Sequence, residues 1–313
     1  MTRALVTGGA GFIGSNLVDG LIARGCSVAV FDDLSTGNVE NLAGAIRAGA
    51  TLHVGDITDP AAVERAFAAV EPDVVYHLAA QIDVRRAVSD PGHDARINVL
   101  GTATVLEQSL HSGVSRFVMA STGGAIYGDA AVVPTPETAP AQPLSPYAVS
   151  KAAAEGYVEY YARDRGLSAF VLRLANVYGP RQDPRGEAGV IAMFCSAAVD
   201  GRVPTVFGDG GQTRDFVYVG DVVDAFCAAG ESQCAGFCNV ATGRETTIAA
   251  LAHALGLQPV AAPARPGEVR RSCLAPGLAA ELLGWHARTT LVDGLAATLA
   301  GTTRAAQFGA LSA

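Results

Sequence analysis

Lysine is almost absent from this 313-residue sequence. Of its 22 basic residues one is lysine, Lys151, and the remaining 21 are arginine. A bias this strong indicates that arginine replaces lysine wherever positive charge alone is required. The one lysine that remains is therefore expected where a compact ammonium group is needed and a planar guanidinium will not serve.

Positive charge and long apolar runs are also scarce. Acidic residues outnumber basic ones, which gives a net charge of −8, so nucleic acid is not an expected partner. No stretch approaches membrane-spanning length, and no apolar run near Met1 leads to a small-residue cleavage site. We therefore expect a cytoplasmic protein without a membrane partner.

The six cysteines lack the spacing of a zinc site. The closest pair, Cys234 and Cys238, has no second pair or histidine nearby, so free thiols in a reducing compartment are expected. Asp209, Asp215 and Asp221 are spread over predicted loops and a helix start, and Asp221 is expected to cap that helix. We therefore expect no metal site.

Apolar residues make up 50% of the chain, so a sizeable core is expected. Strand-like runs alternate with segments of helical spacing, and a long helix is predicted over 146–163. The strand-like runs cover 3–7, 27–32, 51–55, 73–79, 116–121 and 168–175. Such alternation predicts right-handed βαβ units, and hence a Rossmann-type, doubly wound parallel sheet of the α/β class.

A glycine-rich turn follows the first predicted strand. Gly8, Gly11 and Gly14 precede or open an amphipathic helix, where glycine lets backbone N–H groups approach a pyrophosphate at the positive helix end. Asp32 ends the second strand, and a carboxylate there binds ribose hydroxyls and repels a 2′-phosphate, which favours NAD over NADP. Asp56 and Ile57 follow the third strand and are expected near adenine.

The composition of the sequence changes after residue 176, where Gly and Pro become frequent and strand-like runs shorten. We expect residues 1–175 to form the NAD-binding Rossmann domain, to whose sheet a strand returns after residue 205. Residues 176–313 are expected mainly to form a smaller α/β substrate-binding region at the C-terminal end. His77 and Trp285 are expected to pack in the core rather than to bind a ligand.

Tyr147 and Lys151 are the predicted catalytic pair. A spacing of four residues places both on one face of the long helix. A phenol with an ordinary pKa near 10 is a poor base, but a fixed ammonium group and the positive nicotinamide ring of NAD⁺ favour the phenolate. That the lysine of this pair is the single lysine of the chain strengthens the prediction.

Together these motifs resemble the extended short-chain dehydrogenase/reductase family, within its NAD-dependent epimerase/dehydratase group. The resemblance spans nearly the whole chain, and stretches 77–91 and 178–189 look most like bacterial UDP-glucose 4-epimerases. The matching motifs are TGGAGFIG at 7–14, HLAAQ at 77–81, NVLGT at 98–102, YAVSK at 147–151, NVYGPR at 176–181 and TRDFVYVGD at 213–221.

The resemblance implies a tightly bound NAD, a UDP-sugar substrate and a homodimer formed through helices near 96–112 and 146–163. The residues it assigns to the cofactor are Gly8, Gly11, Phe12, Ile13, Gly14, Asp32, Asp33, Asp56, Ile57, Leu78, Ala79, Ala80, Gln81, Asn98, Ser121, Tyr147 and Lys151. Those it assigns to the substrate are Thr122, Gly123, Tyr147, Asn176, Val190, Thr205, Phe207, Arg214, Arg265, Glu268 and Ser272. Forked guanidinium groups such as those of Arg214 and Arg265 suit a diphosphate.

One position departs from the family pattern. Gly123 stands where relatives carry the Ser or Thr hydroxyl that relays a proton. Either Thr122 takes that role, or Tyr147 acts directly on the sugar O4, which we favour because no second group is then needed.

The neighbouring residues favour one reaction. Related dehydratases and decarboxylases carry acids near this loop, whereas Gly124 and Ala125 stand here, so elimination lacks its acid and base. Epimerisation of UDP-glucose and UDP-galactose through a transient 4-keto sugar needs one base, one hydride acceptor and a diphosphate anchor. Ser272 leaves room for an N-acetyl group, so UDP-GlcNAc/UDP-GalNAc remain open, as does UDP-glucuronate. The alternatives are an NDP-4-keto-sugar reductase and a non-catalytic sensor of NAD or sugar nucleotides.

Overall fold

A parallel sheet of seven strands forms the centre of the molecule. The computed structural model describes residues 1–185, 189–264 and 269–311. The strand order is β11-β6-β5-β4-β1-β2-β3, and every neighbouring pair is parallel. The strands are β1 (Arg3–Thr7), β2 (Ser27–Asp32), β3 (Thr51–Val54), β4 (Val74–His77), β5 (Arg116–Thr122), β6 (Ala169–Leu174) and β11 (Gly236–Val240). The predicted doubly wound α/β sheet is confirmed, and its seventh strand, β11, comes from the second half of the chain.

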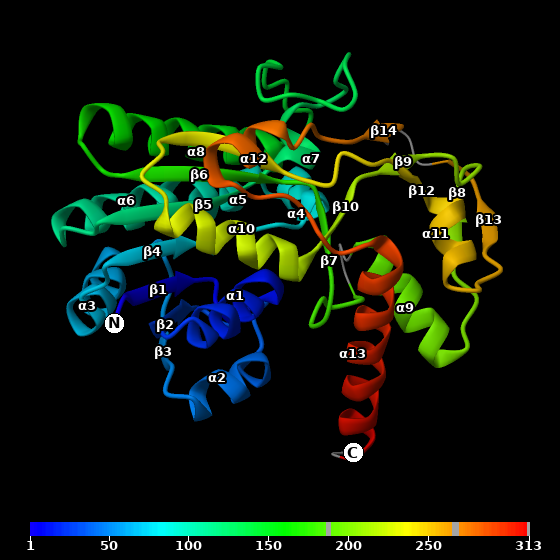
Figure 1. Ribbon diagram of the computed structural model, residues 1–313, viewed down its shortest axis with the longest axis horizontal. Helices are drawn as coiled ribbons and strands as arrows, with labels where there is room; N and C mark the ends of the chain where they lie inside the picture. Colours follow the sequence, from blue (N-terminus) through cyan, green and yellow to red (C-terminus); the bar gives the residue numbers. More distant parts are fainter. Residues whose placement is uncertain (186–188, 265–268, 312–313) are drawn as a thin grey trace.

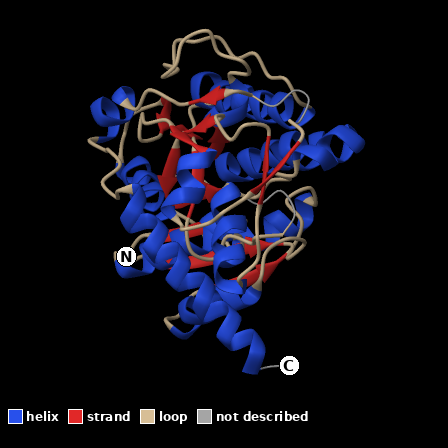
Figure 2. Cartoon of the chain, turned by 90° about the vertical axis from the view of Figure 1, so that its right-hand side faces the viewer, coloured by secondary structure: helices blue, strands red, loops and turns tan. Residues whose placement is uncertain are grey.

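Helices cover both faces of this sheet (Figures 1 and 2). On one face α1 (Phe12–Ala23) packs beside α10 (Val219–Glu231), and on the other α6 (Thr102–His111) lies between α3 (Pro60–Val70) and α8 (Pro146–Asp164). Along β1, Ala4 and Val6 belong to one hydrophobic core while Leu5 belongs to the other, and all three are fully buried. Burial on both faces explains why the sequence shows continuous apolar runs rather than alternation.

Shorter helices connect these layers. They are η1 (Val39–Leu42), α2 (Ala43–Arg47), α4 (Val84–Ser89), α5 (Pro91–Ala95), the π-helical segment η2 (Arg96–Gly101) and α7 (Gly123–Ile126). Segment η2 runs directly into α6, so the helix predicted from residue 96 onward contains a π-helical turn at its start.

A second, smaller region lies beside the carboxyl ends of the strands, to the right in Figure 1. It contains α9 (Val190–Asp200), α11 (Ile248–Ala254) and α13 (Leu291–Leu311), with α12 (Gly277–Leu283) returning to the sheet. Its short strands are β7 (Asn176–Tyr178), β8 (Thr205–Phe207), β9 (Thr213–Arg214), β10 (Phe216–Tyr218), β12 (Thr246–Thr247), β13 (Val260–Ala262) and β14 (Arg271–Ser272). A separate hydrophobic core built around Tyr178, Phe194 and Phe216 holds this region together.

The expected cap at Asp221 is wrong. Helix α10 begins after Tyr218 without a side-chain cap, and Asp221 lies inside its first turn. The buried Asp221 carboxylate instead accepts hydrogen bonds from the backbone N and the hydroxyl of Thr289, at 3.0 and 3.1 Å. The pairing spans 68 residues, so the local sequence favoured a cap where tertiary structure uses the same carboxylate as an anchor.

Other expectations about the core hold. His77 is buried, and its ring nitrogens contact the hydroxyls of Thr7 and Thr102 at 2.8 and 3.0 Å. Trp285 is buried and donates its indole N–H to the Asp221 carbonyl at 2.8 Å. All six cysteines are free thiols.

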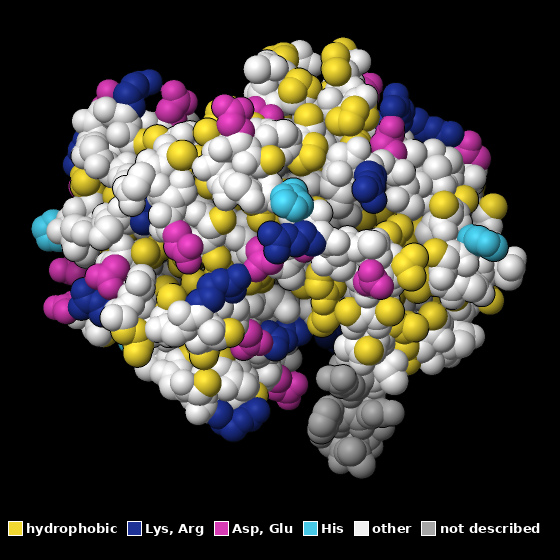
Figure 3. All heavy atoms as spheres, in the orientation of Figure 1, with side chains coloured by type: hydrophobic (Ala, Val, Ile, Leu, Met, Phe, Trp, Pro, Cys, Tyr) yellow, Lys and Arg dark blue, Asp and Glu magenta, His cyan; other side chains and the backbone are white. Residues whose placement is uncertain are grey.

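Side chains of both charges are spread over the face of the protein that is drawn in Figure 3. In the part of the chain that the structure describes, no helix is long and apolar enough to cross a membrane.

Candidate active site

The glycine turn fits a dinucleotide phosphate. Gly8 has a φ of +70°, and a methyl group on it would lie 2.6 Å from the backbone nitrogen of Ala79. A methyl group on Gly14 would collide with the carbonyl oxygen of Gly8. Helix α1 begins at Phe12 after Gly11, whose position carries no side-chain cap, so its first N–H groups remain available for an anion. Ile13 follows within the same first turn.

Asp32 lies where the adenosine ribose of a bound NAD is expected. It ends β2 and is 6% exposed, and its two carboxylate oxygens accept hydrogen bonds from the backbone N of Ala10 and Leu34, both at 2.9 Å. Burial raises the pKa of this carboxyl above its usual value. The neighbouring Asp33 is exposed and binds Ser35. Asp32 is therefore fixed against the glycine turn, as a ribose-binding carboxylate requires.

The other predicted cofactor residues occupy the carboxyl ends of β3, β4 and β5. Asp56 accepts a hydrogen bond from the backbone of Thr58, whereas Ile57 is buried and packs where Gly101 leaves space. Half-buried residues follow β4, and these are Leu78, Ala79 and Ala80.

Gln81 and Asn98 are joined to each other. The backbone N of Gln81 donates to the Asn98 side chain at 2.8 Å, and the Asn98 amide donates back to the Gln81 carbonyl at 3.0 Å. Both residues are buried, and Asn98 lies in the π-helical segment η2. The π-helical turn therefore places an asparagine amide against the loop that follows β4.

Lys151 is buried, as the arginine bias predicts. Its side chain extends from α8 to the sheet, where the ammonium group donates to the Ala120 carbonyl of β5 at 2.7 Å, and the residue is 5% exposed. Burial lowers the pKa of Lys151 to about 8, while the carboxylates of Glu155 and Asp94 act in the opposite direction. An ammonium group fits this narrow contact with one carbonyl, and a forked guanidinium does not.

Tyr147 lies in the first turn of α8, four residues before Lys151. Burial raises the pKa of Tyr147 to about 12, and a side-chain hydrogen bond with Thr122 opposes that rise. The chain alone therefore does not give Tyr147 the low pKa that its sequence motif predicts. Desolvation raises this pKa by more than the groups that favour the phenolate lower it. The positive charge of a bound nicotinamide ring would lower the pKa of Tyr147 and so favour the phenolate.

A side chain at Gly123 would meet the side chain of Leu274. A methyl group on Gly123 would collide with Cδ1 of Leu274. Leu274 follows Ser272 of β14 by two residues, so the strand that carries the predicted specificity residue packs directly on the catalytic loop. The absence of the hydroxyl and the presence of Leu274 are therefore two parts of one packing arrangement.

Backbone hydrogen bonds connect this loop to the substrate region. Asp215 accepts from the backbone N of Asn176 through its carbonyl at 3.0 Å and donates its own N–H to the Ser272 carbonyl at 2.9 Å. Its carboxylate, 1% exposed, accepts hydrogen bonds from Thr242 and Gly243. Asp215 therefore holds Asn176 and Ser272 in register, a role for which the sequence carries no local signal.

The remaining substrate residues lie in the smaller region. Arg214 of β9 is paired in register with Ser272, and its guanidinium donates to the carbonyls of Thr213 and Val269 at 2.7 and 2.9 Å. Thr205 and Phe207 are the two ends of β8, and Val190 begins α9. Arg265 and Glu268 lie outside the described residues. Among the residues that the structure describes, no group of His, Cys, Asp or Glu is arranged to hold a metal.

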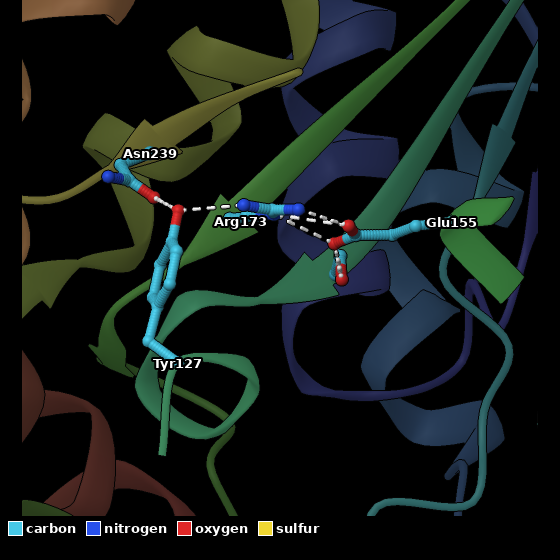
Figure 4. Close-up of polar contacts among 5 residues, drawn as sticks. Tyr127, Glu155, Arg173 and Asn239 are labelled. Atoms are coloured by element: carbon cyan, nitrogen blue, oxygen red, sulfur yellow. Dashed lines mark hydrogen bonds and ion pairs between the residues drawn. The ribbon is translucent and has the colours of Figure 1, made fainter. Parts of the chain in front are cut away.

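A buried ion pair links Glu155 of α8 to Arg173 of β6 (Figure 4). The carboxylate of Glu155, one helical turn after Lys151, accepts from Nη2 of Arg173 at 2.6 Å and from the hydroxyl of Ser121 at 2.5 Å. Arg173 also donates to the Tyr127 hydroxyl at 2.8 Å, and that hydroxyl donates to Asn239 at 3.0 Å. The network joins α8 to β5, β6 and β11. Its one sequence signal is a charged residue, Arg173, inside an apolar strand.

We expect this pair to be essential for stability. The side chains of Arg173 and Glu155 are 8% and 11% exposed. Arg173→Met leaves the carboxylate buried without its cation, so the free energy of unfolding is expected to fall by about 3–5 kcal/mol. Urea denaturation of both proteins measures the difference.

The matched control lies on α8, the helix that carries Glu155. Arg163 and Asp164 form an exposed pair, with side chains 65% and 42% exposed, so Arg163→Met is expected to cost less than about 1 kcal/mol. Equal losses from the two substitutions would contradict the role given to the buried pair.

Comparison with known proteins identifies the family of this chain. Residues 4–241 match the NAD dependent epimerase/dehydratase family. The chain is 46% identical to a UDP-glucose 4-epimerase of Mycolicibacterium smegmatis over 95% of this chain and 97% of that protein. It is also similar to two solved structures. One is the UDP-glucose 4-epimerase of Thermotoga maritima with UDP-glucose (TM-score 0.92, 45% identity, 97% and 99% of the two chains). The other is that of Thermus thermophilus with NAD (TM-score 0.89, 44% identity, 96% and 99%). Because residues 4–241 match this family and these relatives are 44–46% identical over nearly the whole chain, the chain belongs to the NAD dependent epimerase/dehydratase family.

Proposed function

We propose that this protein is an NAD-dependent UDP-hexose 4-epimerase that interconverts UDP-glucose and UDP-galactose. The observation that carries the proposal is a phenol, Tyr147, that is hydrogen-bonded to Thr122 and lies one helical turn before the buried Lys151, while the segment 123–126 that follows Thr122 contains no acid. Relatives that are 46% and 45% identical over nearly the whole chain are UDP-glucose 4-epimerases, which supports it.

Each part of the chain then has one task. The residues from Gly8 to Gly14 and Asp32 hold NAD, which when bound supplies an acceptor and donor of hydride for the sugar C4. Tyr147 removes the proton of the sugar O4 and returns it after the transient 4-keto sugar has rotated to present its other face. Arg214 and the region around β8 and β14 hold the nucleotide diphosphate, which gives the sugar a fixed pivot for presenting its other face.

The direct test uses three substrates. Purified protein is incubated separately with UDP-glucose, UDP-N-acetylglucosamine and UDP-glucuronate, without added NADH, and the products are identified by chromatography. UDP-galactose from the first incubation is expected. Conversion that requires NADH would instead favour the keto-sugar reductase, and unchanged material in all three would contradict the proposal.

We further propose that Thr122 relays the proton between Tyr147 and the sugar. Its hydrogen bond with Tyr147, and the exclusion of a side chain at Gly123 by Leu274, favour this arrangement over direct transfer. Thr122→Val keeps the shape of the side chain but removes the hydroxyl, so kcat is expected to fall by about 10²-fold.

Steady-state kinetics of three proteins distinguishes the two arrangements. Thr122→Ser retains a hydroxyl and is the matched control, expected to keep most of the activity. If the valine variant turned over as fast as the serine variant, Tyr147 would act on the sugar directly.

We also propose a homodimer in the cytoplasm. Leu100 at the end of η2 and Val149, Tyr157 and Tyr160 on α8 are 44–52% exposed, which gives the two helices an apolar outer face that a second copy would cover. Six free cysteines are consistent with a reducing compartment. Light scattering during size-exclusion chromatography is expected to give twice the mass of one chain, and a monomer would contradict the proposal.

A further inference from the structure

Asp94 is a buried carboxylate that none of the roles above uses. It lies in α5 (Pro91–Ala95) and is 1% exposed. Its Oδ1 accepts from the side-chain amides of Gln81 and Asn98, at 2.8 and 3.2 Å. Its Oδ2 is buried and has no hydrogen-bond partner among the described residues. A buried, half-paired carboxylate is unfavourable for folding, so its presence beside the catalytic helix calls for a functional reason.

A short hydrogen-bonded path leads from Asp94 to the catalytic tyrosine. The Asn98 amide that Asp94 holds also donates to the Ser150 hydroxyl at 3.0 Å. That hydroxyl in turn donates to the backbone carbonyl of Tyr147 at 2.9 Å. Because α5 packs along α8, the path fixes the first turn of α8 against η2.

The charge of Asp94 also reaches the catalytic pair. Its field raises the pKa of both Tyr147 and Lys151, although burial is the larger influence on each. Glu155 on α8 acts in the same direction on Lys151, and its own charge is paired with Arg173. The Asp94 carboxylate, which forms no ion pair with the described residues, is thus the negative charge that acts on the phenol as well as on the ammonium group.

Other ionisable groups on the neighbouring elements do not replace it. His77 of β4 is buried and uncharged at neutral pH, because burial and Lys151 lower its pKa to about 3. Arg85 and Arg86 of α4 and Arg96 of η2 are exposed, and Arg96 donates to Thr58.

We propose that Asp94 is a positioning residue of the catalytic centre, which orients the Asn98 amide toward α8 and places a fixed negative charge behind Tyr147 and Lys151. The charge keeps the ammonium group protonated and keeps the phenol protonated until positive charge arrives with the bound cofactor. This role rests on the proposed function, in which Tyr147 exchanges a proton with the substrate.

Asp94→Asn tests the charge while retaining the shape of the side chain. The ionisation of Tyr147 is read as the phenolate absorbance that is lost when Tyr147→Phe is introduced into the same background, with the purified holoenzyme titrated from neutral to alkaline pH. Loss of the negative charge is expected to move the midpoint to lower pH by about one unit. The pH profile of kcat should move in the same direction, since both members of the pair then lose a proton more easily.

Two further variants keep the outcome interpretable. Asp90→Asn makes the same chemical change at an exposed position of the same helix, where asparagine still caps α5, and should leave the midpoint unchanged. Asp94→Glu keeps the charge but displaces the hydrogen bonds, so it should lower kcat at every pH without moving the midpoint. If Asp94→Asn fails to fold, the Tyr147 titration of Asp94→Glu decides. A midpoint at lower pH than that of the wild type overturns the proposal, and a midpoint equal to that of the wild type supports it.

Failure of this inference differs from failure of the proposed function. A midpoint in Asp94→Asn equal to that of the wild type overturns the role of Asp94, whatever reaction the protein catalyses. Unchanged UDP-hexose after incubation with the wild-type protein overturns the proposed function, whatever the titration gives.

Discussion

Replacement of Lys151 by arginine is expected to lower the epimerisation rate by about 10³-fold, although the charge is conserved. The ammonium group donates to the Ala120 carbonyl at 2.7 Å in a site that is 5% exposed. A guanidinium is planar and larger, so it must displace β5 or Tyr147, which overpacks the site. Steady-state assay with UDP-glucose and direct measurement of bound NAD give the two readouts.

The same helix provides the control. Arg163→Lys exchanges the same two residue types at a position where the side chain is 65% exposed, and it should leave kcat unchanged. Lys151→Arg activity within about tenfold of the wild type would mean that positive charge alone suffices. The survival of this one lysine among 22 basic residues would then lose its explanation.

Tyr147→Phe is expected to have the largest effect on catalysis, a loss in kcat of about 10³- to 10⁴-fold. The substitution removes the group that exchanges a proton with the sugar O4 and leaves the ring in place. Since the substitution removes one hydroxyl and keeps the aromatic ring, the fold should survive. Kinetic assay is therefore combined with thermal unfolding and with the amount of NAD released on denaturation, both expected to match the wild type.

Tyr157→Phe is the matched substitution on α8, where the side chain is 44% exposed, and it should leave turnover unchanged. If Tyr147→Phe retained turnover, Tyr147 would not be the group that exchanges a proton with the sugar O4. If Tyr147→Phe left the sugar-nucleotide pools of the cell unchanged, a non-catalytic sensor of sugar nucleotides would become the better interpretation of this chain.

Much of the fold follows from local patterns. The first six strands lie where apolar runs predict them, because strands that are buried on both faces, as all of these except the edge strand β3 are, have few polar positions to break the run. Gly8 and Gly14 could be identified from sequence because close backbone contacts exclude any side chain there. The Lys151 prediction rested on composition, and its burial on β5 follows the same chemical logic.

The rest depends on contacts between residues far apart in the chain. Asp221 reads locally as a cap, yet it binds Thr289, 68 residues away. Leu274 fills the space at Gly123, and Asp94 faces α8 across a long stretch of intervening sequence, so neither role has a local signature. The pKa of Tyr147 was also beyond the sequence, because the extent of desolvation is set by the packed structure.

The most direct test of the proposed reaction follows the hydrogen on C4. UDP-glucose labelled with deuterium at C4 is incubated with the purified protein in ordinary water, and the UDP-galactose formed is analysed by NMR and mass spectrometry. We expect the deuterium to remain on C4 of the product, because the hydride leaves C4 and returns to it without exchange with water, whereas only the O4 proton passes to Tyr147. Deuterium lost to the solvent, or found at C6 of a dehydrated sugar, would contradict the account.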